Sequence, residues 1–205
     1  MLKITRGFKV GYGAKIVAEA ATPVNFARGL TLIRGANACG KTTLLRTVAG
    51  VLVPVTGNVE GFEPMRKNGD IAFLPDKLTF EGHLSPSKIL DSKHGVESVA
   101  KQMATALNLT ETKVERLSHG NTAKLAVAWT IGHPAKVYLL DEPFNGMDED
   151  SMKVFVGECR KMRPEAAFVV SVHGLSWMDD VADQIILFQR IDEWMCFRTE
   201  GKGKI

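Results

Sequence analysis

One stretch of the chain has glycine, lysine and threonine at a spacing that suits phosphate binding. It fits the pattern G-x-x-x-x-G-K-[ST] and reads Gly35-Ala36-Asn37-Ala38-Cys39-Gly40-Lys41-Thr42. The glycines let the main chain wrap a phosphate chain with its N–H groups inward, and a helix start adds positive potential. Lys41 can reach the β and γ phosphates, and Thr42 can offer its hydroxyl to Mg²⁺. The sequence therefore predicts a nucleoside triphosphate site, with Thr43 in the next position of the same helix.

The segments beside this loop have the order that phosphate binding requires. A short apolar run at 30–33 precedes Gly35, and residues 42–48 have the character of a helix opening. Strand, loop and helix therefore follow one another, which makes an incidental glycine turn a poor alternative.

An acidic pair follows a second apolar run. Asp141 and Glu142 come directly after residues 137–140, one hundred residues beyond Lys41. The carboxyl ends of strands are where α/β sheets place ligands. Asp141 would hold Mg²⁺ through its coordinated water and Glu142, pointing the other way, could polarise an attacking water. By itself the pair could equally be a solvated turn before a proline. The functional interpretation of the pair therefore depends on the presence of the phosphate loop.

The remaining patterns predict the elements that must hold these residues. Further buried strands are expected at 71–74 and 168–172, and continuous apolar strands imply a sheet covered on both faces. Val96, Val99, Met103 and Leu107 recur at helical spacing, which predicts a helical insertion at about 77–134. The segment from 184 onward predicts a terminal strand pair, with residues 201–205 fraying.

Composition limits the class of protein. A chain of 205 residues with 45% hydrophobic and 24% charged residues suits one globular unit. The net charge of +3 is too small to argue for a nucleic-acid partner. The three cysteines have neither disulfide nor metal spacing, which favours a reducing cytoplasm. The first residues hold no apolar signal segment and no window reaches a membrane-spanning length, so we expect neither secretion nor a span.

A third motif suggests a family. Leu117-Ser118-His119-Gly120-Asn121 lies before Asp141 where the nucleotide-binding subunits of ABC transporters carry L-S-G-G-Q, and three of its five residues match. The chain thus resembles a small, single-cassette bacterial ATP-binding subunit of this family. The resemblance implies a P-loop NTPase core with a mostly parallel sheet, an antiparallel β subdomain and a small helical subdomain. Residues 1–205 would form one such domain, with the helical part at about 77–134.

The resemblance also implies roles for single residues. Ser118 and Gly120 would contact the γ-phosphate of an ATP held by a second subunit, at a helix N-terminus that Ser118 could equally just cap. His173, after the strand at 168–172, is similar to the family's switch histidine and would bond the γ-phosphate beside Glu142. Residues 145–148 resemble the D-loop, and Tyr12 resembles the aromatic residue that stacks on adenine.

Three positions depart from the family's usual residues or merit a separate test. Asp76 stands where a glutamine usually touches Mg²⁺ and signals to the membrane subunit; a carboxylate can still bind the ion but adds negative charge. His119 replaces a signature glycine and restricts the backbone there. Cys39 lies within the phosphate loop, so a bulky reagent on an exposed thiol there should block nucleotide binding and ATP should protect it.

Three functions remain open at this stage. The first is an ATP hydrolase of a transporter, working as a homodimer or with a related cassette, with ATP and Mg²⁺ as cofactors. It would drive an integral membrane subunit, by preference in export, and lie in the cytoplasm on the inner face of the cell membrane. Its partner would dock near residues 76–83. The alternatives are a soluble ABC-type ATPase outside transport, and a regulatory module that binds nucleotide with little turnover.

Overall fold

The chain folds around an eight-stranded, mostly parallel sheet. The computed structural model describes residues 1–91 and 97–200. The expectations for Val96 and for the tail at 201–205 therefore lie outside the described residues. The strands of the large sheet run in the order β2-β3-β10-β9-β5-β8-β7-β6, and β1 and β4 form a separate antiparallel pair. The strands are β1 (Leu2–Ile4), β2 (Lys9–Tyr12), β3 (Lys15–Ala20), β4 (Val24–Phe26), β5 (Gly29–Arg34), β6 (Ile71–Leu74), β7 (Val137–Leu140), β8 (Ala167–Ser171), β9 (Gln184–Ile191) and β10 (Trp194–Glu200).

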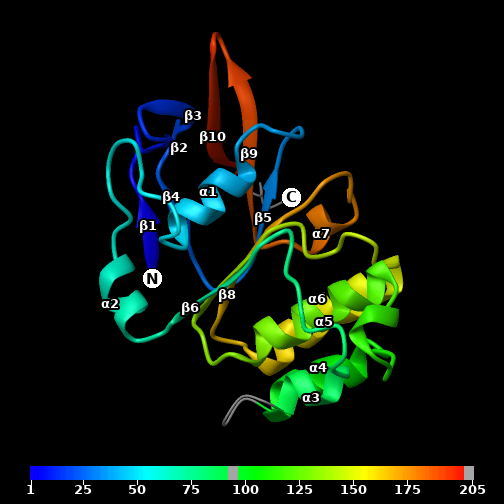
Figure 1. Ribbon diagram of the computed structural model, residues 1–205. Helices are drawn as coiled ribbons and strands as arrows, with labels where there is room; N and C mark the ends of the chain where they lie inside the picture. Colours follow the sequence, from blue (N-terminus) through cyan, green and yellow to red (C-terminus); the bar gives the residue numbers. More distant parts are fainter. Residues whose placement is uncertain (92–96, 201–205) are drawn as a thin grey trace.

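The helices fall into two groups around this sheet (Figure 1). The helices α1 and α2 lie near the N-terminal strands, whereas α3, α4, α5 and α6 gather at the other side of the sheet. The helices are α1 (Lys41–Val48), α2 (Phe62–Lys67), α3 (Pro86–Asp91), α4 (Glu97–Ala106), α5 (His119–Gly132), α6 (Glu149–Met162), α7 (Met178–Val181) and the 3-10 turn η1 (Val114–Arg116). Among helices of the described residues, none combines the length and the apolar character needed to cross a bilayer.

The central strand β7 is apolar throughout because both faces of the sheet are covered there. Every residue of β7 is buried. Tyr138 and Leu140 pack with the helices α4, α5 and α6, while Val137 and Leu139 pack with α1 and the N-terminal strands. Neighbouring side chains of a strand point to opposite faces, so an alternating polar residue would have no solvent to face. This confirms the two-sided sheet expected from the sequence.

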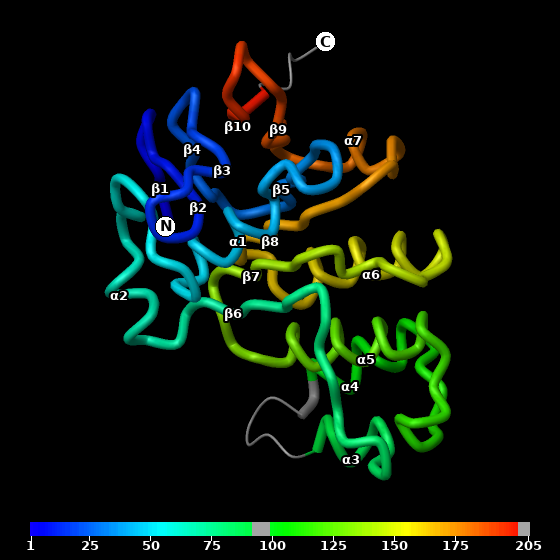
Figure 2. The backbone as a smooth tube through the Cα atoms, turned by 45° about the horizontal axis from the view of Figure 1, so that its top comes forward, coloured from blue at the N-terminus to red at the C-terminus, as the bar shows by residue number. Residues whose placement is uncertain are grey.

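The predicted strands and helix are close to those observed. The strands at 71–74 and 137–140 coincide with β6 and β7, and the strand expected at 168–172 is displaced by one residue as β8. The helix expected from 42 begins at Lys41. The terminal strand pair is present as β9 and β10, which run antiparallel and form a long projecting hairpin (Figure 2).

The stretch between β6 and β7 contains α3, α4, η1 and α5. Met103 and Leu107 are buried and Val99 packs beside them, as the helical spacing indicated. This helical group lies away from the N-terminal strands (Figure 2). Its exact limits as a subdomain, about 77–134, stay a prediction.

Candidate functional site

The phosphate loop joins β5 to α1 and takes a backbone shape that favours small residues. Gly40 precedes the helix with φ of 111° and Ala38 has φ of 59°, both in the left-handed region. A Cβ on Gly40 would lie 2.9 Å from Cγ1 of Val17, so a larger residue would meet the neighbouring strand. Within the described residues, no side chain caps the first turn of α1. Its N–H groups therefore stay available to an anion such as a phosphate.

Lys41 is folded back onto its own loop. The side chain is only 5% exposed, and its ammonium donates to the carbonyl oxygens of Gly35 (3.0 Å) and Ala36 (2.9 Å). A buried ammonium needs such partners. A bound phosphate would compete with the two carbonyls for the same charge.

A cavity of about 310 Å³ lies beside this loop. Tyr12 contributes to its wall, half-exposed, with its hydroxyl 3.4 Å from Oγ1 of Thr43. Glu142 reaches the same cavity from the end of β7. The full lining is Tyr12, Val17, Ala38, Gly40, Lys41, Thr42, Thr43 and Glu142. The aromatic residue, the loop and one member of the acidic pair, far apart in sequence, thus share one cavity.

The other carboxylate of the pair is buried and only partly satisfied. Asp141 is 1% exposed, and its Oδ1 accepts a hydrogen bond of 2.8 Å from the Ser171 hydroxyl. Its Oδ2 has no hydrogen-bond partner among the residues that the structure describes. Burial raises the pKa of Asp141 above its usual range, while the hydroxyls of Ser171 and Thr42 lower it and the charge of Asp76 raises it. An unpartnered carboxylate oxygen beside a threonine hydroxyl fits a divalent cation such as Mg²⁺.

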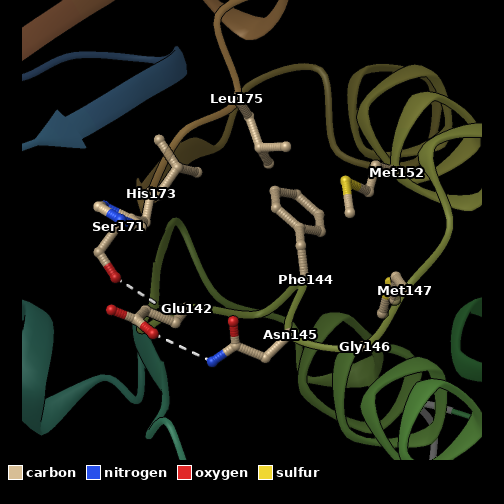
Figure 3. Close-up of a pocket in the computed structure, with 10 residues that line it drawn as sticks. Glu142, Phe144, Asn145, Gly146, Met147, Met152, Ser171, His173 and Leu175 are labelled. Carbon is tan, nitrogen blue, oxygen red and sulfur yellow. Dashed lines mark hydrogen bonds between the residues drawn. The ribbon is translucent and has the colours of Figure 1, made fainter.

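Glu142 points elsewhere because its backbone takes an uncommon conformation. Its φ is 48°, in the left-handed region that non-glycine residues rarely adopt without support from their surroundings. Asn145 donates from Nδ2 to Oε2 of Glu142 at 3.0 Å (Figure 3). Half-buried Glu142 and exposed His173 both line a cavity of about 200 Å³. Glu142 thus lines both this cavity and the phosphate-loop cavity, and Asp141 lines neither of them.

The other candidate residues lie on the side of the helical group. Asp76 is exposed and lines a largely apolar cavity of about 320 Å³ with Asp141, Glu142 and His119. Ser118 caps α5, with its Oγ accepting the N–H of Asn121 at 3.2 Å. Neither Ser118 nor Gly120 belongs to the lining of the phosphate-loop cavity as the structure describes it.

The expectation of an exposed Cys39 thiol is wrong. The residue is 5% exposed and buried behind the loop, where a Cβ on Gly35 would come within 2.7 Å of its Sγ. Burial raises the pKa of the Cys39 thiol despite the nearby charge of Lys41. The loop presents its main chain to the cavity and turns this side chain into the core, which the motif pattern does not specify.

Sequence reasoning missed Ser171 and the contact from Asn145 to Glu142. In the apolar segment 168–172 the serine gave one signal, because a polar side chain interrupts a strand that is otherwise apolar. A polar residue in a strand does not by itself show which groups its hydroxyl contacts.

Comparisons with known proteins agree with this geometry. The sequence pattern of the family described as ABC transporter matches residues 26–145. The cytochrome c biogenesis ATP-binding export protein CcmA of Zymomonas mobilis is 32% identical over 156 residues, covering 72% of this chain and 68% of the relative. The chain belongs to the ABC transporter family, and as one of its ATP-binding proteins it is an ATP hydrolase.

Solved structures share the fold. The ATP-binding subunit of an ABC transporter superposes with a TM-score of 0.76 at 20% identity, covering 91% of this chain and 85% of that one. The archaeal ribosome recycling factor aABCE1, solved in complex with the ribosomal stalk protein aP1, reaches a TM-score of 0.74 at 22% identity, covering 97% of this chain and 40% of that one. The architecture is therefore the ABC ATPase cassette, a P-loop fold.

Proposed function

We propose that this ATP-binding protein energises export through a separate integral membrane subunit. Two copies, or this chain and a related cassette, would close head to tail around two ATP molecules, and hydrolysis would reopen them. The observation that carries the proposal is the junction at Glu142, which lines the phosphate-loop cavity on one side and the His173 cavity on the other. The CcmA relative is named an ATP-binding export protein, which supports the direction of transport.

ATP hydrolysis requires the protein to neutralise charge and to position the reacting groups. The ammonium of Lys41 and the N–H groups at the start of α1 would meet the β and γ phosphates, and Tyr12 would stack on the adenine ring. Glu142 would orient the attacking water and accept its proton, with His173 holding the γ-phosphate. The two cavities that Glu142 lines, one with Tyr12 and Lys41 and one with His173, support these roles.

The Asp141 Oδ2 atom and the Thr42 hydroxyl would hold Mg²⁺, with Asp76 reaching it from the side of the helical group. When bound, the ion neutralises charge on the β and γ oxygens. The described residues hold no group of three or more histidine, cysteine, aspartate or glutamate side chains able to bind a metal. Oxygens of the nucleotide and water molecules would supply the remaining ligands of the ion.

Ser118 and Gly120 would act on the ATP held by the other subunit. They begin α5, whose N-terminus carries the positive end of the helix dipole. The membrane subunit would dock near residues 76–83 and hold the protein on the cytoplasmic face of the membrane. No nucleic acid is needed as a partner.

The shared fold also supports a second candidate, an ATPase that works outside transport. The likeness to a ribosome recycling factor, with a TM-score of 0.74, is nearly as close as the likeness to a transporter subunit, with 0.76. Purification from membranes separates the two. A transporter subunit is expected to copurify with a multi-spanning protein, and its recovery free of any membrane protein would favour the soluble candidate.

Replacing Glu142 by glutamine tests the assigned chemistry. The Glu142→Gln protein keeps the shape of the side chain but cannot accept a proton, so ATP should still bind while turnover falls by about 100-fold or more. Calorimetry would measure binding and phosphate release would measure turnover. Light scattering would show whether the trapped ATP complex is a dimer.

Glu149→Gln is the matched control. Glu149 is exposed in the first turn of α6 and pairs with Lys153 at 2.7 Å, away from the cavities described above. The Glu149→Gln protein should hydrolyse ATP at the wild-type rate. Wild-type turnover by the Glu142 variant would remove that residue from the mechanism.

A further inference from the structure

Ser171 connects the two carboxylate residues of the site through one hydroxyl group. It is the last residue of β8 and is fully buried. Its hydroxyl donates to Oδ1 of Asp141 at 2.8 Å and accepts the backbone N–H of Glu142 at 2.8 Å (Figure 3 shows the latter). A hydroxyl has one proton to give. The proton therefore goes to the carboxylate and a lone pair goes to the amide.

Each of the two hydrogen bonds acts on one residue of the acidic pair. With Oδ1 of Asp141 occupied, the oxygen left for a cation is Oδ2, which accepts no hydrogen bond in the described part of the chain. The bond to the Glu142 amide holds a residue whose φ of 48° needs support. Glu142 lines the phosphate-loop cavity and the His173 cavity, whereas Asp141 lines neither of these two.

The local sequence does not require a serine for packing. Val169 and Val170 before it are fully buried and apolar, and the strand lies between β5 and β7. Both side-chain hydrogen bonds of Ser171 go to the acidic pair. A hydroxyl in this place is therefore explained by the site and not by the core.

We propose that Ser171 is a positioning residue for ATP hydrolysis, which directs Asp141 toward the metal and Glu142 toward the attacking water. The inference rests on the ATP site proposed above. Ser171 itself touches neither ATP nor metal, and it acts through the two carboxylate residues.

Ser171→Ala removes both bonds and is the first test. The variant should bind ATP without metal as the wild type does, because the phosphate loop is unchanged. With ATP present, its affinity for Mn²⁺, a spin-active substitute for Mg²⁺, should fall by about 10-fold, and kcat by about 10- to 100-fold with KM for ATP little changed. Spin resonance titration measures the metal binding apart from turnover.

A second substitution that restores the hydroxyl distinguishes a positioning role of Ser171 from a packing role. Ser171→Thr keeps the hydroxyl and should recover most of the metal affinity and kcat. If the alanine variant does not fold, Ser171→Cys keeps the shape of the side chain, slightly enlarged, with a weaker hydrogen-bonding group and should show the same losses to a smaller degree.

Thr31→Val is the matched control. Thr31 is a buried hydroxyl on the adjacent strand β5 that donates to Gln184 at 3.2 Å, away from the acidic pair. The Thr31→Val protein should keep the wild-type affinity for Mn²⁺ and the wild-type kcat. The proposal is overturned if folded Ser171→Ala matches the wild type in both, or if Thr31→Val loses as much. A wild-type protein that does not bind ATP would overturn the site itself.

Discussion

The position of Cys39 shows how the phosphate loop divides its backbone from its side chains. The two residues before it are exposed, whereas the thiol is turned inward. Phosphate binding by main-chain N–H groups leaves the side chain free to take either direction. The core behind the loop accepts a small apolar group such as a thiol.

The burial of Cys39 predicts slow chemical modification. Little of this thiol reaches the reagent, and its raised pKa leaves less of the reactive thiolate at neutral pH. In the folded protein, iodoacetamide should label half-buried Cys196 before Cys39, and Cys39 should react freely only in denaturant. Mass spectrometry of timed samples measures both rates. Equal rates for Cys39 with and without denaturant would contradict the buried position.

Three helices begin at the functional region, and their N-termini differ in how they are capped. Gly40 precedes α1 without a side-chain cap, which leaves N–H groups for an anion. Ser118 caps α5, and Asp148 caps α6 by accepting the N–H and the hydroxyl of Ser151, both at 2.8 Å. The uncapped helix is thus the one whose N-terminus adjoins the phosphate-loop cavity.

The cap on α6 predicts a pH-dependent contribution to stability. The hydrogen bonds from Ser151 lower the pKa of Asp148 to about 2, below the value of about 4 for an unfolded aspartate. The stabilisation is therefore complete above about pH 4 and is lost as the pH falls toward 2. Asp148→Ala should be less stable than the wild type at pH 7, with a difference that narrows below pH 4.

Denaturant unfolding at several pH values measures this difference. Asp148→Asn is the control, because asparagine also caps helices but carries no titrating group. Its stability should lack the part of the pH dependence that Asp148 contributes. A gap between Asp148→Ala and the wild type that stays constant from pH 7 to pH 3 would contradict the assignment.

Close contact between distant segments holds α5 against the turn that follows the acidic pair. A Cβ on Gly120 would lie 2.4 Å from the carbonyl oxygen of Gly146, and one on Gly146 would lie 2.4 Å from Cδ2 of His119. Lys124 adds an ion pair with Asp148 at 3.6 Å. The segment that resembles the signature is therefore packed directly on the turn that begins at Glu142.

This packing predicts opposite effects for two glycine substitutions. Gly120→Ala should lower the free energy of unfolding by about 1–3 kcal/mol, because backbone must move to admit the methyl group. Gly157 lies inside α6 with open space around its Cβ position. Gly157→Ala should raise the same free energy by about 0.5–1 kcal/mol through helix propensity.

Thermal and denaturant unfolding of both variants measure the two effects, with a shift in Tm of about 2–4 °C per kcal/mol for a chain of this size. A Gly120 variant as stable as the wild type would show that α5 and the turn are not in tight contact.

Much of the architecture could be predicted from the residues in order along the chain. The phosphate loop, the acidic pair and the strands β6 and β7 depend on local patterns, so 35–42, 141–142 and the two apolar runs were sufficient to find them. The strands β1 to β4 gave weaker signals. Unlike β7, each of them includes exposed residues, and they are defined by pairing with segments elsewhere, such as β3 with β10.

Local pattern thus determined which residues are available for chemistry, and packing between distant positions decided how they are arranged. Whether Cys39 faces solvent depends on the core behind the loop, and the partners of Ser171 depend on the pairing of β8 with β7. The approach of Gly120 to Gly146 depends on how α5 meets the acidic turn. Each of these joins positions separated along the chain, and a one-dimensional pattern does not contain the distances between them.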